Sequence, residues 1–126
     1  MSGKVFILDT NIIIYLSQDK IKMTDFASKG DRLCISIISY MEALGHTFKN
    51  DEEKTIVKSL CEACEVFNLT RQITEKTIEI RKQAKIKLPD AIIAASAIVN
   101  KAVLVTANVK DFKIIDGISI INPIPD

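Results

Sequence analysis

The sequence predicts an α/β protein with a parallel sheet that helices cover on both faces. Three runs of β-branched and apolar residues have the length of buried strands, at 4–8, 33–37 and 102–106. Segments of helical length separate these runs, so strands and helices alternate along the chain. Nearly continuous hydrophobicity in the strands, combined with this alternation, is typical of a parallel sheet that is buried on both sides.

Two weaker runs complete the expected sheet. Residues 65–69 and 118–122 also resemble short strands, and Pro123 ends the second of them. Between the strands we expect helices in six segments: 11–17, 22–29, 39–49, 51–63, 71–87 and 89–101.

The fifth of these segments has the clearest helical pattern. Ile73, Thr77 and Ile80 recur at steps of three and four residues while charged residues fall elsewhere, so one face of this helix is apolar. Pro89 is expected at the first helical position of the next helix, because a proline there costs no hydrogen bond and the residue before it favours an extended backbone.

Size and composition indicate one globular unit. A chain of 126 residues with 48% hydrophobic residues can form one compact core, so we expect a single domain over residues 1–126. The formal charge of +1 gives no general attraction to nucleic acid or membranes, and any site for a polyanion must be local. The longest apolar run, residues 91–99, is far shorter than the roughly 20 residues that span a bilayer. We therefore expect no membrane association.

The three cysteines indicate a reducing environment. Cys34, Cys61 and Cys64 are an odd number, and the chain begins without a basic leader segment, so a secreted disulfide framework is disfavoured. We expect a cytoplasmic protein. The pair in "CEAC" could indicate metal or redox chemistry, but no second pair completes a zinc site, and small buried side chains are the favoured interpretation.

Four acidic residues follow or flank the expected strands. Asp9 ends the first strand, Glu42 follows the second, Asp111 follows the strand at 102–106, and Asp90 opens the helix before that strand. Because ligands of such sheets bind at the carboxyl ends of the strands, these carboxylates can meet at one edge. Clustered carboxylates raise one another's pKa unless a cation lies among them, and oxygen ligands suit Mg²⁺ or Mn²⁺.

Each acid also has a purely structural interpretation. Asp9, Thr10 and Asn11 are typical helix N-caps, although a cap needs only one of them, and the triplet favours a function. In "SYME" the spacing of Ser39 and Glu42 is that of a capping box, which is the favoured interpretation of Glu42 from this pattern alone. Asp90 could stabilise its helix N-terminus, and Asn108 and Asp111 could cap a short helix.

Four motifs together resemble one known family. "FILDTNIII", "SIISYMEAL", "KLPDAIIAASA" and "LVTANVKDFKII" are similar, in order and spacing, to the PIN domain, and most to the VapC-type toxins of toxin–antitoxin modules. The resemblance covers nearly the whole chain. It implies a three-layer α/β/α fold with a five-stranded parallel central sheet, in which the first strand lies between its neighbours, and it implies a metal-dependent endoribonuclease.

The resemblance assigns roles to individual residues. Asp9, Glu42 and Asp90 match the first three acidic positions of the family, and Asn11 matches a polar residue that holds the first carboxylate. The fourth position falls on Asn108 or on Asp111, and we assign it to Asp111. Asn108 and Thr106 then support the site, together with Thr10.

The expected chemistry is hydrolysis of RNA phosphodiester bonds with Mg²⁺, or Mn²⁺ in its place. We expect Asp9 and Asp90 to bind the ion directly, and Glu42 and Asp111 to bind a second ion or orient the attacking water. The resemblance implies products with 5′-phosphate and 3′-hydroxyl ends. It leaves open whether the substrate is a transfer RNA, a ribosomal loop or a messenger, and whether the chain is a toxin or a housekeeping nuclease.

A basic segment precedes the third acidic position. Its cations form either a solvated helix face or an edge that contacts the RNA backbone, and the candidates are Arg81, Lys82, Lys85 and Lys87, extended by Lys110 and Lys113. His46, the only histidine, is expected at the surface or an interface and not in catalysis. Aromatic residues make up only 6% of the chain, and no motif for base stacking is visible.

The resemblance also implies partners. The family usually forms homodimers and is inhibited by an antitoxin whose peptide crosses the active-site groove. Residues 12–16 and 41–48 could supply the apolar surface for such contacts, although a monomer core would use the same residues. An inactive PIN-fold module that binds RNA or protein is the alternative. A haloacid-dehalogenase-type phosphatase is disfavoured, because Asn11 stands where that class needs a second acid.

Overall fold

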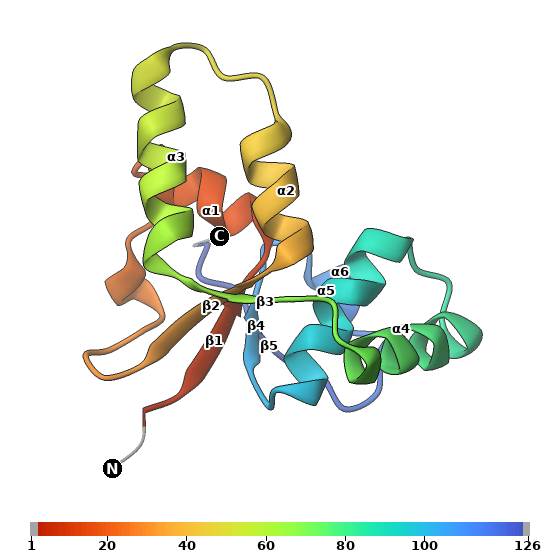
Figure 1. Cartoon of the computed structure of the whole chain (residues 1–126). Helices are drawn as coiled ribbons and strands as arrows, with labels where there is room; N and C mark the ends of the chain where they lie inside the picture. Colours follow the sequence, from red (N-terminus) through yellow and green to blue (C-terminus); the bar gives the residue numbers. More distant parts are fainter. Residues whose placement is uncertain (1–2, 125–126) are drawn as a thin grey trace.

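The computed structural model describes residues 3–124, and a parallel sheet of five strands lies at its centre (Figure 1). The strands are β1 (Val5–Leu8), β2 (Arg32–Ser36), β3 (Glu65–Phe67), β4 (Val103–Val105) and β5 (Ser119–Ile121). Their order in the sheet is β3-β2-β1-β4-β5, and every neighbouring pair is parallel. The expected parallel sheet with the first strand between its neighbours is therefore confirmed.

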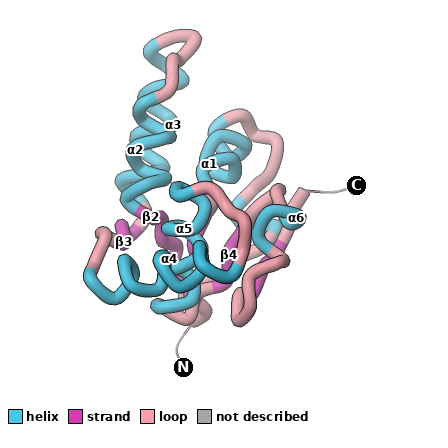
Figure 2. The backbone as a smooth tube through the Cα atoms, turned by 90° about the vertical axis from the view of Figure 1, so that its right-hand side faces the viewer, coloured by secondary structure: helices cyan, strands magenta, loops and turns pink. Residues whose placement is uncertain are grey.

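Helices form a layer on each face of this sheet, as the two views in Figures 1 and 2 show. The helices are α1 (Thr10–Ser17), α2 (Ile37–Gly45), α3 (Asp51–Ala63), α4 (Arg71–Gln83), α5 (Leu88–Val99) and α6 (Val109–Phe112), with a short 3₁₀ helix η1 (Met23–Asp25). One layer contains α1, α2 and α3, and the other contains α4, α5 and α6. The three-layer α/β/α fold is thus confirmed.

The side chains of the central strand alternate between two hydrophobic clusters. Ile7 points into the cluster under α4, α5 and α6, whereas Phe6 and Leu8 point into the cluster under α1, α2 and α3. The first cluster includes the fully buried alanines of α5, whose small side chains bring this helix close to the sheet. Burial on both faces explains why the strands are apolar at nearly every position.

Several helix ends differ from the sequence expectation. The expected helix over 22–29 forms only η1, and the expected helix over 39–49 begins earlier, at Ile37, with Ser36 as its N-cap. Helix α4 stops at Gln83 instead of residue 87, and α5 begins at Leu88 instead of Pro89. Lys87, the N-cap of α5, has an extended backbone with a ψ of 148°, whereas Leu88, directly before Pro89, is already helical. The extended conformation expected at Leu88 is therefore found one position earlier.

Strand register brings distant polar residues to one edge of the sheet. Leu8 pairs with Val105 in the register of β1 and β4, so the next residues, Asp9 and Thr106, lie beside each other. The register of β1 and β2 pairs Ile7 with Cys34, and β2 therefore ends close to the end of β1. The carboxyl ends of three strands thus lie together, as expected for a ligand site in this type of sheet. None of the helices within residues 3–124 has the length and apolarity that crossing a membrane requires.

A residue just after the end of α5 adopts a left-handed backbone conformation that glycine would favour. Lys101 has a φ of 53°, in the left-handed region, and the amide of Ala102 donates a hydrogen bond to the Ala97 carbonyl at 2.8 Å. Glycine adopts this conformation without the cost that a side chain adds. We therefore expect Lys101→Gly to raise the free energy of unfolding by about 0.5–1 kcal/mol in urea denaturation. Lys101→Ala is the matched control, and an equal gain in this variant would show that the side chain, not the backbone, causes the effect.

Candidate active site

Asp9 is a buried carboxylate that accepts two hydrogen bonds. It lies directly after β1 and is only 5% exposed. Its Oδ1 accepts a hydrogen bond from the backbone amide of Thr10 at 2.8 Å, and its Oδ2 accepts one from the hydroxyl of Thr106 at 2.7 Å. Asp9 is therefore the N-cap of α1, as its structural interpretation required, and it is also fixed in orientation from the neighbouring strand.

The expected role of Asn11 is not what the structure shows. Asn11 is exposed on α1, and within residues 3–124 its side chain makes no hydrogen bond to Asp9. Thr10 and Thr106 supply the donors instead. Thr106 is fully buried, because β4 lies next to β1 in the sheet, and a hydroxyl there reaches the carboxylate that follows β1.

Glu42 is held by Thr10 and not by a capping box. The helix begins at Ile37 with Ser36 as its cap, so Glu42 lies in the second turn of α2 and cannot bond back to an N-cap at Ser39. The hydroxyl of Thr10 donates to Oε1 of Glu42 at 2.6 Å and lies 3.1 Å from the hydroxyl of Ser39. The capping-box interpretation is therefore wrong, and the local signal for the true cap was Ser36 at the end of the strand.

Thr106 links Asp9 to the segment that carries the fourth acid. While its hydroxyl donates to Asp9, the same oxygen accepts a hydrogen bond from the backbone amide of Asn108 at 3.0 Å. Asn108 is the N-cap residue of α6, but its exposed side chain makes no capping hydrogen bond. Asn108 thus supports the site through its backbone.

The other two acids come from the opposite helical layer. Asp90 lies in the first turn of α5 and is half-buried. Asp111 lies in α6 and is exposed, while the next residue, Phe112, is fully buried and anchors this short helix to the core. Four separate segments of the chain thus contribute the four candidate carboxylates.

Burial and mutual repulsion shift the pKa values of two of these acids upward. Desolvation raises the pKa of Asp9 above its ordinary value, and the charges of Glu42 and Asp111 add to this rise, whereas the hydrogen bonds from Thr106 and Thr10 oppose it. Desolvation also raises the pKa of Asp90, together with the charges of the other three acids, and Lys87 opposes the rise. The charges of the other three acids thus raise the pKa of Asp90, and those of Glu42 and Asp111 raise the pKa of Asp9, a repulsion that a bound cation relieves.

The oxygen atoms of these acids suit the open coordination of a magnesium ion, not a site that encloses a metal with protein ligands alone. Within residues 3–124, no lysine, arginine or histidine forms an ion pair with any of the four acids. No three acidic, histidine or cysteine side chains of this part of the chain lie close enough to enclose a metal. Mg²⁺ usually binds through one or two carboxylates and keeps water or substrate phosphate as its other ligands, so an open pair such as Asp9 and Asp90 suits it.

A cationic hollow adjoins these acids. It measures about 290 Å³, and its lining combines three lysines with two of the acids: Lys85, Lys87, Lys110, Asp90, Asp111, with Ile86 and Ile114. Arg81 and Lys82 lie in the last turn of α4 and do not line this hollow, nor does Lys113. The structure therefore gathers only part of the basic segment beside the carboxylates.

The cysteines lie in the interior and not at this site. Cys34 and Cys61 are buried, and Cys64 follows α3 in a half-buried position. Burial raises the pKa of Cys34 and of Cys64 to about 11, so both remain protonated at neutral pH. The burial of Cys34 and Cys61 agrees with their interpretation as small buried side chains.

The raised pKa values of Asp9 and Asp90 predict how a divalent ion affects stability. Without an ion, these acids contribute most stability below their ordinary pKa of 3.8, and this contribution is lost as pH rises through the raised values. We therefore expect Mg²⁺ to raise Tm more at neutral pH than at about pH 5, by several °C when the ion is well above its Kd. Thermal melts with NaCl at matched ionic strength are the control. An equal rise with NaCl, or at both pH values, would contradict a site at these acids.

Comparisons with known proteins agree with this fold. The family model of the PIN domain matches residues 6–118. A protein named Ribonuclease VapC1 from Rickettsia felis is 31% identical over 91% of this chain and 93% of its own length, and one of the same name from Haemophilus influenzae is 32% identical over 86% and 90%.

Solved structures show the same similarity. The chain resembles one in VapBC2 of Rickettsia felis bound to a promoter DNA fragment, with a TM-score of 0.80, 25% identity and coverage of 94% and 98% of the two chains. It also resembles one in VapBC-1 of nontypeable Haemophilus influenzae, with a TM-score of 0.76, 28% identity and the same coverage. The sequence match and the three-layer fold lead to one conclusion: this chain belongs to the PIN domain family.

Proposed function

We propose that this protein is an endoribonuclease that hydrolyses RNA phosphodiester bonds with Mg²⁺, or Mn²⁺ in its place. One observation carries the proposal: acids from three other segments raise the pKa of Asp90 by their charges, and the innermost acid, Asp9, is buried with no cationic partner among residues 3–124. The relatives named ribonuclease support the same activity.

Each candidate residue has a defined task in this mechanism. Asp9 and Asp90 would hold the ion, and the hydrogen bonds from Thr10 and Thr106 keep the carboxylate of Asp9 in one orientation. When bound, a divalent ion lowers the pKa of water and neutralises charge on phosphate oxygens. Thr10 fixes one oxygen of Glu42, and the other oxygen can accept a hydrogen bond from the attacking water.

Asp111 has a less constrained position, on the exposed side of the same edge. It lines the cationic hollow together with Asp90 and Lys110. We assign it either to a second ion or to orientation of the water. A neutral Asn108 beside it supports the backbone of α6 and supplies no charge.

The three lysines of the cationic hollow are the RNA-backbone contacts that we propose. Lys85, Lys87 and Lys110 stand beside the acids, where they can offset the negative charge that would otherwise repel a phosphate. Arg81 and Lys82 are exposed in the last turn of α4 and do not line the hollow. We assign them a longer-range electrostatic role only.

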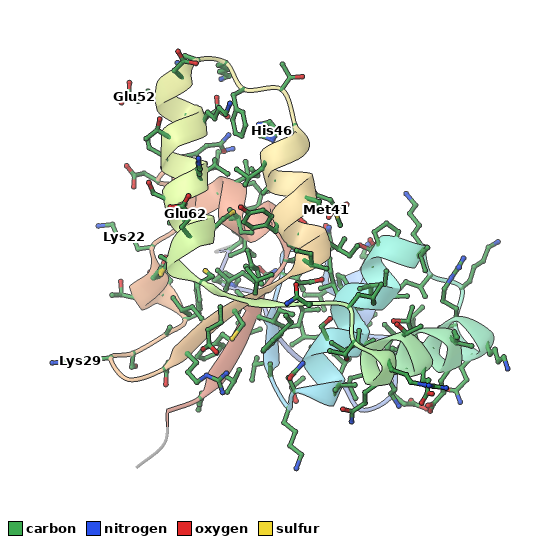
Figure 3. The ribbon with its side chains drawn as sticks, in the orientation of Figure 1. Lys22, Lys29, Met41, His46, Glu52 and Glu62 are labelled. Carbon is green, nitrogen blue, oxygen red and sulfur yellow. The ribbon has the colours of Figure 1, made fainter. Side chains whose placement is uncertain are left out.

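Removing two of these lysines should change the salt dependence of RNA binding. Each phosphate contact adds about 0.7 to the slope of log affinity against log salt for single strands. We therefore expect the double variant Lys85→Ala, Lys87→Ala to reduce this slope by about 1.4, measured by titration of a fluorescent single-stranded RNA. Lys22 and Lys29 are the matched control pair, since Figure 3 shows them on the far side of the molecule from α4. A similar reduction in the control variant would mean that binding follows net charge and not this hollow.

The direct test is cleavage of RNA by the purified protein. We expect cleavage with Mg²⁺ or Mn²⁺, none after chelation with EDTA, and recovery when the ion is restored. Products with 5′-phosphate ends would be substrates for ligation without prior phosphorylation. Binding of RNA with no cleavage under any of these conditions would favour the inactive binding module instead.

We further propose that this nuclease is the toxin of a toxin–antitoxin pair. The similar structures of VapBC2 and VapBC-1 support an antitoxin partner, as does a toxin–antitoxin complex from Klebsiella pneumoniae with a TM-score of 0.72 and 27% identity. Expression of the chain alone should arrest growth, and co-expression of the neighbouring reading frame should restore it. Normal growth in both cases would leave a housekeeping nuclease as the better interpretation.

The structure limits which apolar residues could bind partners. Ile12 and Ile13 are buried in the core and cannot contact a partner. Of the expected surface over residues 12–16, only the half-buried residues 14–16 remain accessible. Met41 is 55% exposed and lies on the side of α2 that faces away from α3 (Figure 3). His46 faces α3 instead, 3.6 Å from a carboxylate oxygen of Glu53. We propose a homodimer, and a monomer in sedimentation equilibrium would exclude it.

A further inference from the structure

Two further hollows continue along the edge that carries the acids. One of about 380 Å³ is lined by residues 107–111 and shares Lys110 and Asp111 with the cationic hollow. The next, which we name the Tyr15 hollow, measures about 250 Å³ and is lined by Tyr15, Lys20, Ala107 and Ile124. Because Ala107 lines both, the Tyr15 hollow adjoins the hollow that Asp111 lines.

The sheet topology explains why the Tyr15 hollow lies at this edge. Tyr15 belongs to α1, which follows β1, while Ala107 follows β4 and Ile124 follows β5. These three strands are neighbours in the sheet and run in the same direction. Their carboxyl ends therefore bring the lining residues together on the same side as Asp9, although up to 109 positions separate them in the chain.

The end of α1 places a cation over the aromatic ring. Asp19 adopts a φ of 57°, and the amide of Lys20 donates a hydrogen bond to the Tyr15 carbonyl at 3.0 Å, which turns the chain back over the helix. Nζ of Lys20 then lies 5.3 Å from the centre of the Tyr15 ring. An aromatic face and an exposed cation thus lie together in a hollow whose other walls, Ala107 and Ile124, are apolar.

We propose that the Tyr15 hollow binds a base of single-stranded RNA beside the cleaved phosphate. The base would stack on Tyr15 against Ala107 and Ile124, and Lys20 would move from the ring to the adjoining phosphate. This inference rests on the proposed ribonuclease activity. It also predicts little discrimination between bases, because every base has a face that can stack on an aromatic ring.

Charge and size favour RNA over a peptide as the occupant. None of the four lining residues is acidic, and Lys20 and Lys110 place positive charge at both ends of the path from the hollow to Asp111. The hollow is smaller than the roughly 300–1,000 Å³ of usual small-molecule sites, which suits one base better than a larger ligand. The Tyr15 hollow adjoins the hollow lined by Asp111, so a base held there would lie near the acids.

Two substitutions at Tyr15 separate stacking from other roles. In an Asp9→Asn background, which prevents cleavage, Tyr15→Leu should weaken binding of a single-stranded RNA oligonucleotide by roughly 5- to 100-fold. Tyr15→Phe keeps the aromatic face and should bind like its parent. Since Tyr15 also packs against the cluster under α1, thermal melts must show that both variants fold.

A second variant does not disturb the core. Lys20 is exposed, and Lys20→Gln should weaken RNA binding several-fold and reduce the salt slope by about 0.7. Photocrosslinking gives an independent readout: RNA that carries 5-iodouridine at successive positions should crosslink to Tyr15 only from positions next to the cleavage site. Peptide mapping by mass spectrometry would identify Tyr15 as the attached residue.

The outcomes distinguish this inference from the proposed activity. If the protein cleaves RNA but Tyr15→Leu and Lys20→Gln bind and cleave like the parent, the inference is overturned and the nuclease stands. If binding depends on Tyr15 but no cleavage occurs, the Tyr15 hollow still binds an RNA base, and the nuclease assignment fails. Association with a co-expressed protein that requires Tyr15, while RNA binding does not, would show that the hollow holds a peptide and would overturn the RNA assignment.

Discussion

Asp9→Asn is expected to lower the rate of RNA cleavage by roughly 10³-fold, equivalent to about 4 kcal/mol of transition-state stabilisation. The neutral amide keeps the shape of the side chain but removes the charge that would hold a divalent ion. Cleavage is measured as kcat/KM on a labelled RNA at saturating Mg²⁺. Asp116→Asn, which neutralises an exposed acid after α6, is the matched control and should cleave like the unmodified protein.

The same substitution should not cost stability. An asparagine can still accept a hydrogen bond from Thr10, and its amide can donate to Thr106, whose hydroxyl has a free lone pair. Because burial raises the pKa of Asp9, the charged form is unfavourable in the folded protein. In metal-free buffer we expect Asp9→Asn to be more stable than the unmodified protein at neutral pH, with the difference vanishing below about pH 4. A large loss of stability would mean that the lost activity reflects misfolding.

Thr106→Val should lower activity by about 10- to 100-fold, because the fully buried Thr106 acts through its hydrogen bond to Asp9. Its hydroxyl donates to Asp9 and lowers the pKa of that acid, so its loss raises the pKa further. Since the reaction needs the charged carboxylate, the rising acidic limb of the profile of kcat/KM against pH should move to higher pH. This shift separates a positioning role from a general loss of folded protein.

Thr106→Ser is the matched control because it keeps the hydroxyl. It should retain the pH profile of the unmodified protein. Thr106→Val also leaves the Asn108 amide without its acceptor, which should cost about 1–3 kcal/mol of unfolding free energy. A valine variant with an unshifted acidic limb would show that the hydrogen bond to Asp9 does not control its charge.

Much of the fold could be predicted because it depends on local patterns. The strands at 4–8, 33–37 and 102–106 are apolar at nearly every position, which only burial on both faces explains. Helix 51–63 has the expected bounds, since Asn50 caps it and its first turn is acidic. The gathering of acids could be anticipated for the same reason, because a polar residue after a buried parallel strand must lie at the carboxyl edge of the sheet.

The hydrogen-bond partners predicted for Glu42 and Asn11 were wrong because each local sequence pattern is compatible with two structures. Ser39 and Glu42 have the spacing of a capping box, but Ser36 begins the helix, and Glu42 bonds to Thr10 from another helix. Asn11 lies two positions after the acid that it was expected to hold, yet it is exposed on α1, and Thr106 donates to that acid instead. Sequence proximity does not settle either case, because the competing partners lie 32 and 97 positions from the residues they contact.

Residues that are neighbours in the chain specify the apolar strands, the helical faces and the positions of the acids that follow the strands, so these features could be predicted. The contacts of Thr106 with Asp9 and of Thr10 with Glu42, and the hollow that Tyr15 shares with residues 107 and 124, are visible only in the folded chain. Strand order and register create these contacts, and both depend on how the whole core packs.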